Sequence, residues 1–106
     1  MKILFDQGTP VPLRGFLADH TIDTAFERGW GTLENGQLLQ AAETNDYEIL
    51  ITTDQNLRYQ QNIQARKIAI IVLKSTSWPR IQNHAETIAK IVVETVSGDY
   101  REIPIS

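Results

Sequence analysis

Short apolar runs recur along this chain, and most of them are followed by a stretch with apolar residues at helical spacing. Three runs have the length and composition of buried strands: residues 2–5, 48–53 and 67–73. The third, Lys-Ile-Ala-Ile-Ile-Val-Leu, is continuous and rich in β-branched residues. Such runs are typical of strands that are covered on both faces, as in parallel sheets.

Two more segments have weaker strand patterns. Residues 20–27 alternate between apolar and polar positions, which predicts a strand with Ile22, Thr24 and Phe26 on one face. Residues 100–105 predict a last strand. Pro104 favours an edge position for it, because proline lacks the N–H group that a central strand donates.

The segments between the strands predict helices. Thr9 is a favoured N-cap residue and Pro10 suits the first helical position, so a first helix is expected over residues 10–17. Asn35 is also a favoured N-cap residue and predicts a second helix over residues 36–44.

The longest predicted helix begins at Ser77-Trp78-Pro79 and ends at Gly98. One face of it carries, at helical spacing, Ile81, Ala85, Ile88, Val92 and Val96. A shorter helix is expected before it, over residues 55–62.

Strands alternate with helices along the chain, which favours a three-layer α/β fold. We expect a mainly parallel sheet of about four to five strands with helices on both faces. The length of 106 residues and the hydrophobic fraction of 42% fit one globular domain over residues 1–106.

Charge and composition limit the classes of function that fit this chain. The formal net charge of −3 argues against a general basic coat for nucleic acid, although a metal site needs acidic residues. The candidates for a local basic patch are Arg14, Arg28, Arg58, Arg66 and Lys67. No cysteine is present, so disulfides and thiol catalysis are excluded. No signal peptide pattern or membrane-spanning run is visible, and we predict a cytoplasmic protein without a membrane partner.

Two predicted strands end on an aspartate, at Asp6 and at Asp54. In a parallel sheet these ends lie at one edge, where ligands bind at the point of strand-order reversal. If the two strands are neighbours, the carboxylates converge there, and a divalent cation offsets their repulsion. Each aspartate alone fits equally well as a helix cap. The hydroxyl groups of Thr52 and Thr53 are candidates to support a carboxylate, and Thr53 is slightly favoured.

The segments "KILFDQGTP…LRGFL", "TLENGQLLQAAE" and "ILITTDQNLRYQQN" together resemble the PIN-like domain family. These proteins are small relatives of PIN-domain nucleases and of VapC-type toxins, and the resemblance covers Lys2 to about Leu73. It implies a compact α/β fold in which clustered acidic residues hold Mg²⁺ or Mn²⁺ and cleave RNA by metal-assisted hydrolysis. It also implies an antitoxin-like protein as the partner of a toxin, and a homodimer.

Carried over residue by residue, the resemblance implies that Asp6 and Asp54 are the metal ligands. A further acid is usual at the start of the middle helix, where this chain has Asn35 with Glu34 beside it. Another acid is common two residues after the second aspartate, where this chain has Asn56. Asp6, Asp54, Asn35 and Glu34 are therefore the predicted catalytic residues, and weaker metal binding is expected because an amide brings no charge.

Other residues have weaker claims to the site. Glu43 and Asp99 are alternative sources of a third acid. Gln55, Asn56 and Arg58 are the predicted contacts to a phosphate or base edge, although Arg58 fits better as a solvated helix residue.

Three functions fit this pattern. The first is a Mg²⁺- or Mn²⁺-dependent ribonuclease of the PIN-like type, as the toxin of a toxin–antitoxin pair. The second is a non-catalytic PIN-like module that binds RNA or a protein, which the amides Asn35 and Asn56 favour. The third and remote one is a receiver-like phosphoacceptor domain, against which the single acid after the first strand counts.

Overall fold

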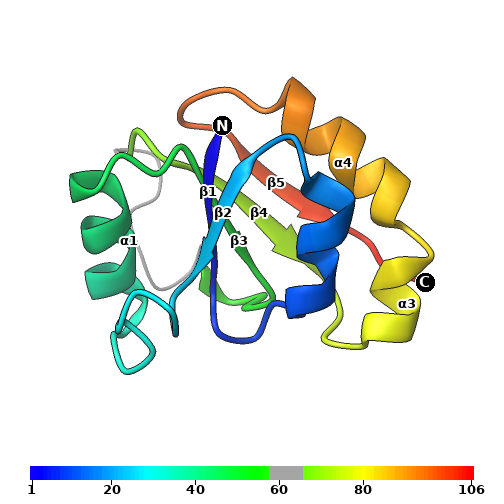
Figure 1. Ribbon diagram of the computed structural model, residues 1–106, viewed down its shortest axis with the longest axis horizontal. Coiled ribbons are helices and arrows are strands. Elements are labelled where there is room, and N and C mark those ends of the chain that lie inside the picture. The colour runs from blue at the N-terminus through cyan, green and yellow to red at the C-terminus, as the bar shows by residue number, and fades with distance from the viewer. Residues whose placement is uncertain (58–65) are drawn as a thin grey trace.

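A computed structural model describes residues 1–57 and 66–106 of the chain. Within them a five-stranded parallel sheet has the order β2-β1-β3-β4-β5 (Figure 1). The strands are β1 (Lys2–Phe5), β2 (Thr21–Thr24), β3 (Ile49–Thr52), β4 (Ala69–Leu73) and β5 (Tyr100–Ile103). The helices are η1 (Val11–Leu17), α1 (Asn35–Thr44), α3 (Trp78–Gln82) and α4 (Ala85–Glu94). The predicted α/β fold with a mainly parallel sheet is confirmed.

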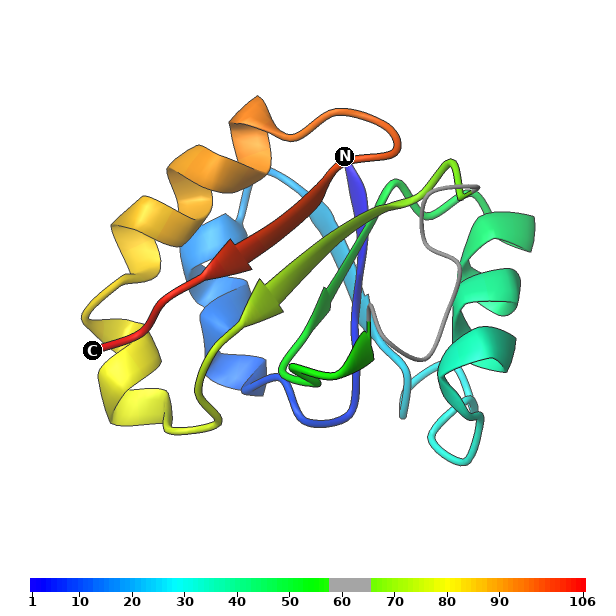
Figure 2. The same ribbon diagram turned by 180° about the vertical axis from the view of Figure 1, so that it is seen from behind.

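Helices cover both faces of the sheet, with α1 on one face and η1, α3 and α4 on the other (Figures 1 and 2). Alternate strand residues face opposite layers because successive side chains in a strand point in opposite directions. Leu4 and Leu50 pack toward α1 with Leu38 and Leu39. The opposite layer contains, among others, Ile3, Phe5, Ile49, Ile51, Ile71, Ile88 and Val92. Each continuous apolar run therefore contributes side chains to two cores, one on each face of the sheet.

The sheet has β2 at one edge and β5 at the other. The edge position that Pro104 predicts for the last strand is confirmed, since β5 pairs with β4 on one side and Pro104 follows its final residue.

The second strand is shorter than the alternation predicts. It ends at Thr24 because Glu27 folds back on it: the Thr24 N–H donates to Glu27 Oε1 at 2.9 Å, and the Glu27 N–H donates to Thr24 Oγ1 at 3.0 Å. The prediction that Phe26 shares one strand face with Ile22 and Thr24 is wrong. Phe26 lies in the turn after β2, where it is 77% exposed.

Two helix starts differ from the predicted ones. The residues after β1 form the 3₁₀ helix η1, and the Thr9 hydroxyl donates to the Ile51 carbonyl at 2.8 Å instead of capping a helix. Helix α1 has Glu34 as its N-cap, one residue earlier than predicted, because Glu34 and Gln37 form a reciprocal capping box. The short helix predicted over residues 55–62 falls mostly on residues 58–65, which lie outside the described residues.

The single long helix predicted after residue 77 is wrong. It is divided into α3 and α4 by Asn83 and His84, and the His84 backbone (φ −110°, ψ 9°) departs from helical geometry. The break preserves the apolar face, because Ile81 and Ala85 on either side of it are both buried. Helix α4 stops at Glu94, so Val96 lies beyond its end and is 64% exposed.

Tyr47 joins the amino end of β3 to the edge strand. Its hydroxyl donates to Asp23 Oδ2 in β2 at 2.5 Å, and the side chain is buried against α1 and Trp30. Burial, together with the hydrogen bond to Asp23, raises the pKa of Tyr47 to about 12.

This shift predicts a loss of stability at high pH. The unfolded chain releases the phenol proton near pH 10, whereas the folded chain keeps it until about pH 12. The stabilisation is therefore complete below pH 10 and is lost as the pH rises through 12. We expect the free energy of unfolding to fall by about 2 kcal/mol more in the wild type than in Tyr47→Phe over this interval. Urea unfolding of both proteins from pH 9 upward measures it, and parallel curves would refute it.

None of the helices in residues 1–57 and 66–106 combines the length and the apolarity that crossing a bilayer requires.

Candidate functional site

The sheet has a strand-order reversal between β1 and β3. The chain passes from β1 to β2 on one side and then returns to place β3 on the other side of β1. Open α/β sheets bind ligands at the carboxyl ends of the strands at such a switch point. The loops that carry Asp6 and Asp54 leave the sheet there, side by side at its lower edge in both ribbon views (Figures 1 and 2).

Thr52, the last residue of β3, links the two aspartates. Its hydroxyl donates to Asp6 Oδ2 at 2.8 Å and accepts the Asp54 N–H at 3.1 Å. Thr52 is 1% exposed, so this hydroxyl has no competing solvent. The sequence slightly favours Thr53 as the residue whose hydroxyl supports a carboxylate. In the structure, Thr52 supplies this hydroxyl to Asp6.

The sheet register explains why Thr52 has this role. Phe5 and Ile51 are paired across β1 and β3, and the Asp6 N–H donates to the Ile51 carbonyl at 2.9 Å. The next position of each strand therefore places Asp6 beside Thr52. Once β1 and β3 are known to pair, aligning "KILFD" with "ILIT" places the final Asp6 opposite the final Thr52.

The Asp54 carboxylate is held by two amide-bearing residues. The Asn35 side chain donates to Asp54 Oδ2 at 2.6 Å, and the Asn56 backbone N–H donates to Asp54 Oδ1 at 2.9 Å. A carboxylate only accepts hydrogen bonds, so the NH₂ group of Asn35 must face it. Asn35 is the first residue of α1, which explains how this helix orients a carboxylate that belongs to the loop after β3.

Each oxygen of the Asp6 and Asp54 carboxylates accepts a hydrogen bond from the protein. Asp6 Oδ1 accepts the Gln7 N–H at 2.7 Å, so each of the four carboxylate oxygens has one donor among the described residues. A carboxylate oxygen has two lone pairs, and these donors occupy one of them. Oxygen ligands of this type suit Mg²⁺ and Mn²⁺. Within residues 1–57 and 66–106 no three acidic or histidine side chains gather to hold a metal.

The other predicted acids lie apart from Asp6 and Asp54. Glu34 is near the same edge, but its carboxylate accepts the backbone N–H of Gln37 in the capping box. Glu43 is the next-to-last residue of α1, at the other end of the helix, and pairs with Arg66 at 2.6 Å. Asp99 precedes β5, at the amino end of the sheet, and accepts the Val96 N–H. Because strands and helices alternate in direction, Glu43 and Asp99 both lie at the end of the sheet where the strands begin, opposite the switch point.

The predicted substrate contacts are described in part. Asn56 is exposed and its backbone holds Asp54, while Gln55 is exposed in the turn between them. Arg58, the predicted phosphate contact, lies outside the described residues.

The described arginines of the candidate basic patch are spread over the molecule. Arg14 forms a two-bond ion pair with Glu27, which lowers the pKa of the glutamate through these hydrogen bonds. Arg28 lies over the Trp30 ring, with 4.6 Å from its guanidinium carbon to the ring centroid. Arg66 is at the amino end of the sheet. Among these described residues no basic cluster forms at the switch point.

The loops after β1 and β3 are in close contact at Gly8. A Cβ atom on Gly8 would lie 2.5 Å from Thr53 Oγ1, which is inside van der Waals contact. We expect Gly8→Ala to destabilise the protein by about 1 kcal/mol through this overlap. Adding Thr53→Ala removes the overlapping oxygen and is expected to restore most of the loss. Thermal unfolding of the two single variants and the double variant measures this coupling, and additive effects would contradict it.

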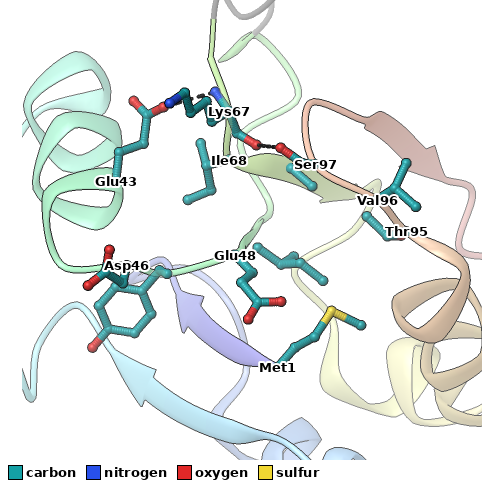
Figure 3. Close-up of a pocket in the computed structure, with 12 residues that line it drawn as sticks. Met1, Glu43, Asp46, Glu48, Lys67, Ile68, Thr95, Val96 and Ser97 are labelled. Atoms are coloured by element: carbon teal, nitrogen blue, oxygen red, sulfur yellow. Dashed lines mark hydrogen bonds between the residues drawn. The ribbon is translucent and has the colours of Figure 1, made fainter.

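A cavity of about 520 Å³ lies at the end of the sheet where the strands begin, opposite the switch point (Figure 3). Its polar groups hold the start of β4: Glu43 Oε2 accepts the Lys67 N–H at 3.0 Å, and the Ser97 hydroxyl donates to the Lys67 carbonyl at 2.6 Å (Figure 3). These bonds fasten one segment to the sheet. We place the candidate site at the switch point instead, because Thr52 joins the loops that carry Asp6 and Asp54 there, at the end of the sheet where α/β sheets bind ligands.

The strand order also suits a receiver-like domain, because flavodoxin-like and receiver folds share the order 2-1-3-4-5.

Comparisons with protein-family models, curated proteins and solved structures found no significant match to this chain. The chemistry of the site therefore has to be inferred from its own side chains.

Proposed function

We propose that this protein is a Mg²⁺- or Mn²⁺-dependent ribonuclease of the PIN-like type. The observation that carries the proposal is the link from Asp6 through the Thr52 hydroxyl to the Asp54 backbone at the β1/β3 switch point. A buried threonine that fixes two carboxylate-bearing loops to each other is what a two-carboxylate metal site requires. A toxin role, an antitoxin-like partner and a homodimer extend this proposal through the resemblance to PIN-like proteins.

The chain's own residues would act as follows. Asp6 and Asp54 hold the cation, and the bound cation supplies a more acidic water and positive charge beside the phosphate. Thr52 keeps the Asp6 carboxylate oriented. Asn35 and the Asn56 backbone hold both oxygens of Asp54, so that its lone pairs stay directed to one place.

Cleavage of a mixed structured RNA by the purified full chain tests the proposal. We expect products with Mg²⁺ or Mn²⁺ and none with EDTA, because the site has no described cation to neutralise the phosphate. A folded protein that leaves single-stranded, hairpin and duplex RNA intact in both metals would refute the nuclease.

One observation favours the second candidate, a non-catalytic module that binds RNA or a protein. All four carboxylate oxygens already accept a protein hydrogen bond, so the site is satisfied without a metal. A metal titration followed by thermal unfolding separates the two candidates. Binding at the site raises the midpoint of the wild type but not of Asp6→Asn, whereas a non-catalytic module shows no specific rise.

A further inference from the structure

Asn35 is followed by a glycine, Gly36, at the start of α1 and beside Asp54. An asparagine side chain loses ammonia when the backbone nitrogen of the next residue attacks its Cγ atom. Glycine in the next position favours this attack, because it has no Cβ atom to obstruct the approach and adopts unusual backbone angles readily. The other asparagines of the chain precede larger residues: Asn45-Asp46, Asn56-Leu57, Asn62-Ile63 and Asn83-His84.

The attacking nitrogen is available at this position. The first N–H groups of a helix have no carbonyl partner within it, and the Gly36 N–H is one of them. The Glu34 carboxylate accepts the next N–H, that of Gln37, and no described residue accepts that of Gly36. Asn35 and Gly36 are both half-buried, so water reaches the dipeptide.

The position in the helix decides whether the side chain can reach this nitrogen. Ring closure requires a rotation of the Asn35 backbone, and it requires the side-chain NH₂ group to leave Asp54 Oδ2, to which it donates at 2.6 Å. Both changes need the first turn of α1 to open. Helix ends open locally at a small cost in free energy, and glycine in a helix lowers that cost further.

We propose that Asn35 is a self-modification site, which deamidates in the folded protein. The Gly36 nitrogen gives its proton to water and forms a bond to Asn35 Cγ. The bond from Cγ to Nδ2 breaks, and Nδ2 leaves as ammonia with a proton from water. Water then opens the succinimide ring at either carbonyl and leaves an aspartate or an isoaspartate. The conversion consumes water, releases ammonia and involves no oxidation.

The product has a carboxylate where Asn35 now donates to Asp54. The modification itself is independent of the proposed function, but its consequence rests on it: with a cation held by Asp6 and Asp54, an aspartate at position 35 supplies a third charged ligand. The isoaspartate form lengthens the main chain by a carbon atom and disturbs the start of α1. Deamidation to aspartate would therefore strengthen the proposed metal site as the protein ages.

Incubation of the full chain in EDTA at mildly alkaline pH tests the proposal. Tandem mass spectrometry of proteolytic peptides follows, at each asparagine, the gain in mass that replacement of NH₂ by OH brings. The same chain in guanidinium chloride gives the rate without tertiary structure. Gly36→Ala is the test variant, and Asn35→Gln is a second variant that keeps an amide at position 35.

We expect Asn35 to convert in the folded wild type before any other asparagine of the chain. Gly36→Ala should slow the conversion by about fivefold, because alanine makes opening of the first turn rarer by that factor. Conversion in guanidinium chloride but not in the folded chain would overturn the proposal, and so would an unchanged rate in Gly36→Ala. Should Gly36→Ala fail to fold, Asn35→Gln decides: gain of acid at the wild-type rate would place the reaction at another residue.

The response to metal is a separate readout. Anion exchange isolates the converted protein by its added charge, and thermal unfolding in EDTA and in Mn²⁺ compares its aspartate form with Asn35→Asp. We expect the two proteins to respond alike. Conversion at Asn35 without a larger rise of the midpoint in Mn²⁺ would remove the metal consequence and leave the modification.

Discussion

Replacing Asp54 with asparagine is expected to reduce metal-dependent RNA cleavage about a thousandfold, as the loss of several kcal/mol of charge stabilisation implies. Asparagine has the same shape but brings no charge, so the cation loses one of its two ligands. The fold should survive, because one of the two hydrogen bonds from Asn35 and Asn56 can still be accepted by the new amide oxygen. The lost bond costs about 1 kcal/mol of stability.

Initial cleavage rates over a range of Mn²⁺ concentrations measure this effect. Asp6→Asn should behave in the same way, because the proposed site uses both carboxylates to hold one cation. Asp19→Asn is the matched control, since Asp19 is exposed in the turn before β2, at the other edge of the sheet. Activity in Asp54→Asn close to that of Asp19→Asn would mean that the nuclease site is elsewhere.

Replacing Asn35 with aspartate is expected to have opposite effects with and without metal. The Asn35 NH₂ group lies 2.6 Å from Asp54 Oδ2, so a carboxylate there meets a carboxylate. In EDTA the pair must share a proton or separate, and we expect a stability loss of about 1–3 kcal/mol. With Mn²⁺ the new carboxylate becomes a third charged ligand of the cation. The midpoint of thermal unfolding should therefore rise more than in the wild type, and cleavage should increase.

Asn35→Ala separates the two parts of this prediction. It removes the hydrogen bond to Asp54 without adding charge, so it should lose stability in EDTA and gain nothing from Mn²⁺. Thermal unfolding of the three proteins, in EDTA and over a Mn²⁺ series, gives both quantities. If Asn35→Asp responded to Mn²⁺ no more than Asn35→Ala, position 35 would have no access to the cation.

Much of the fold could be predicted from local pattern. Residues 2–5 and 67–73 are apolar without interruption, and burial on both faces of a parallel sheet is the usual outcome of such runs. The start of α1 was predicted within one residue, because polar capping residues precede its apolar face. The neighbouring placement of Asp6 and Asp54 was predicted only as a condition on the strand order, which the structure meets.

Local pattern failed where contacts distant in sequence or side-chain hydrogen bonds intervene. Alternation continues to Phe26, but the Thr24–Glu27 bonds end the strand before it. Helical spacing runs through Asn83 and His84, yet the chain turns there while keeping both flanking apolar residues buried.

The layers of this protein and the type of group at its strand ends follow from the order of apolar and polar residues along the chain. Which of these groups come into contact depends on how the elements pack. The pairing of β1 with β3 places Thr52 beside Asp6, and the direction of α1 brings Asn35 to Asp54 while carrying Glu43 to the far edge. Strand register and helix direction are set by packing of the whole sheet, which no single segment encodes.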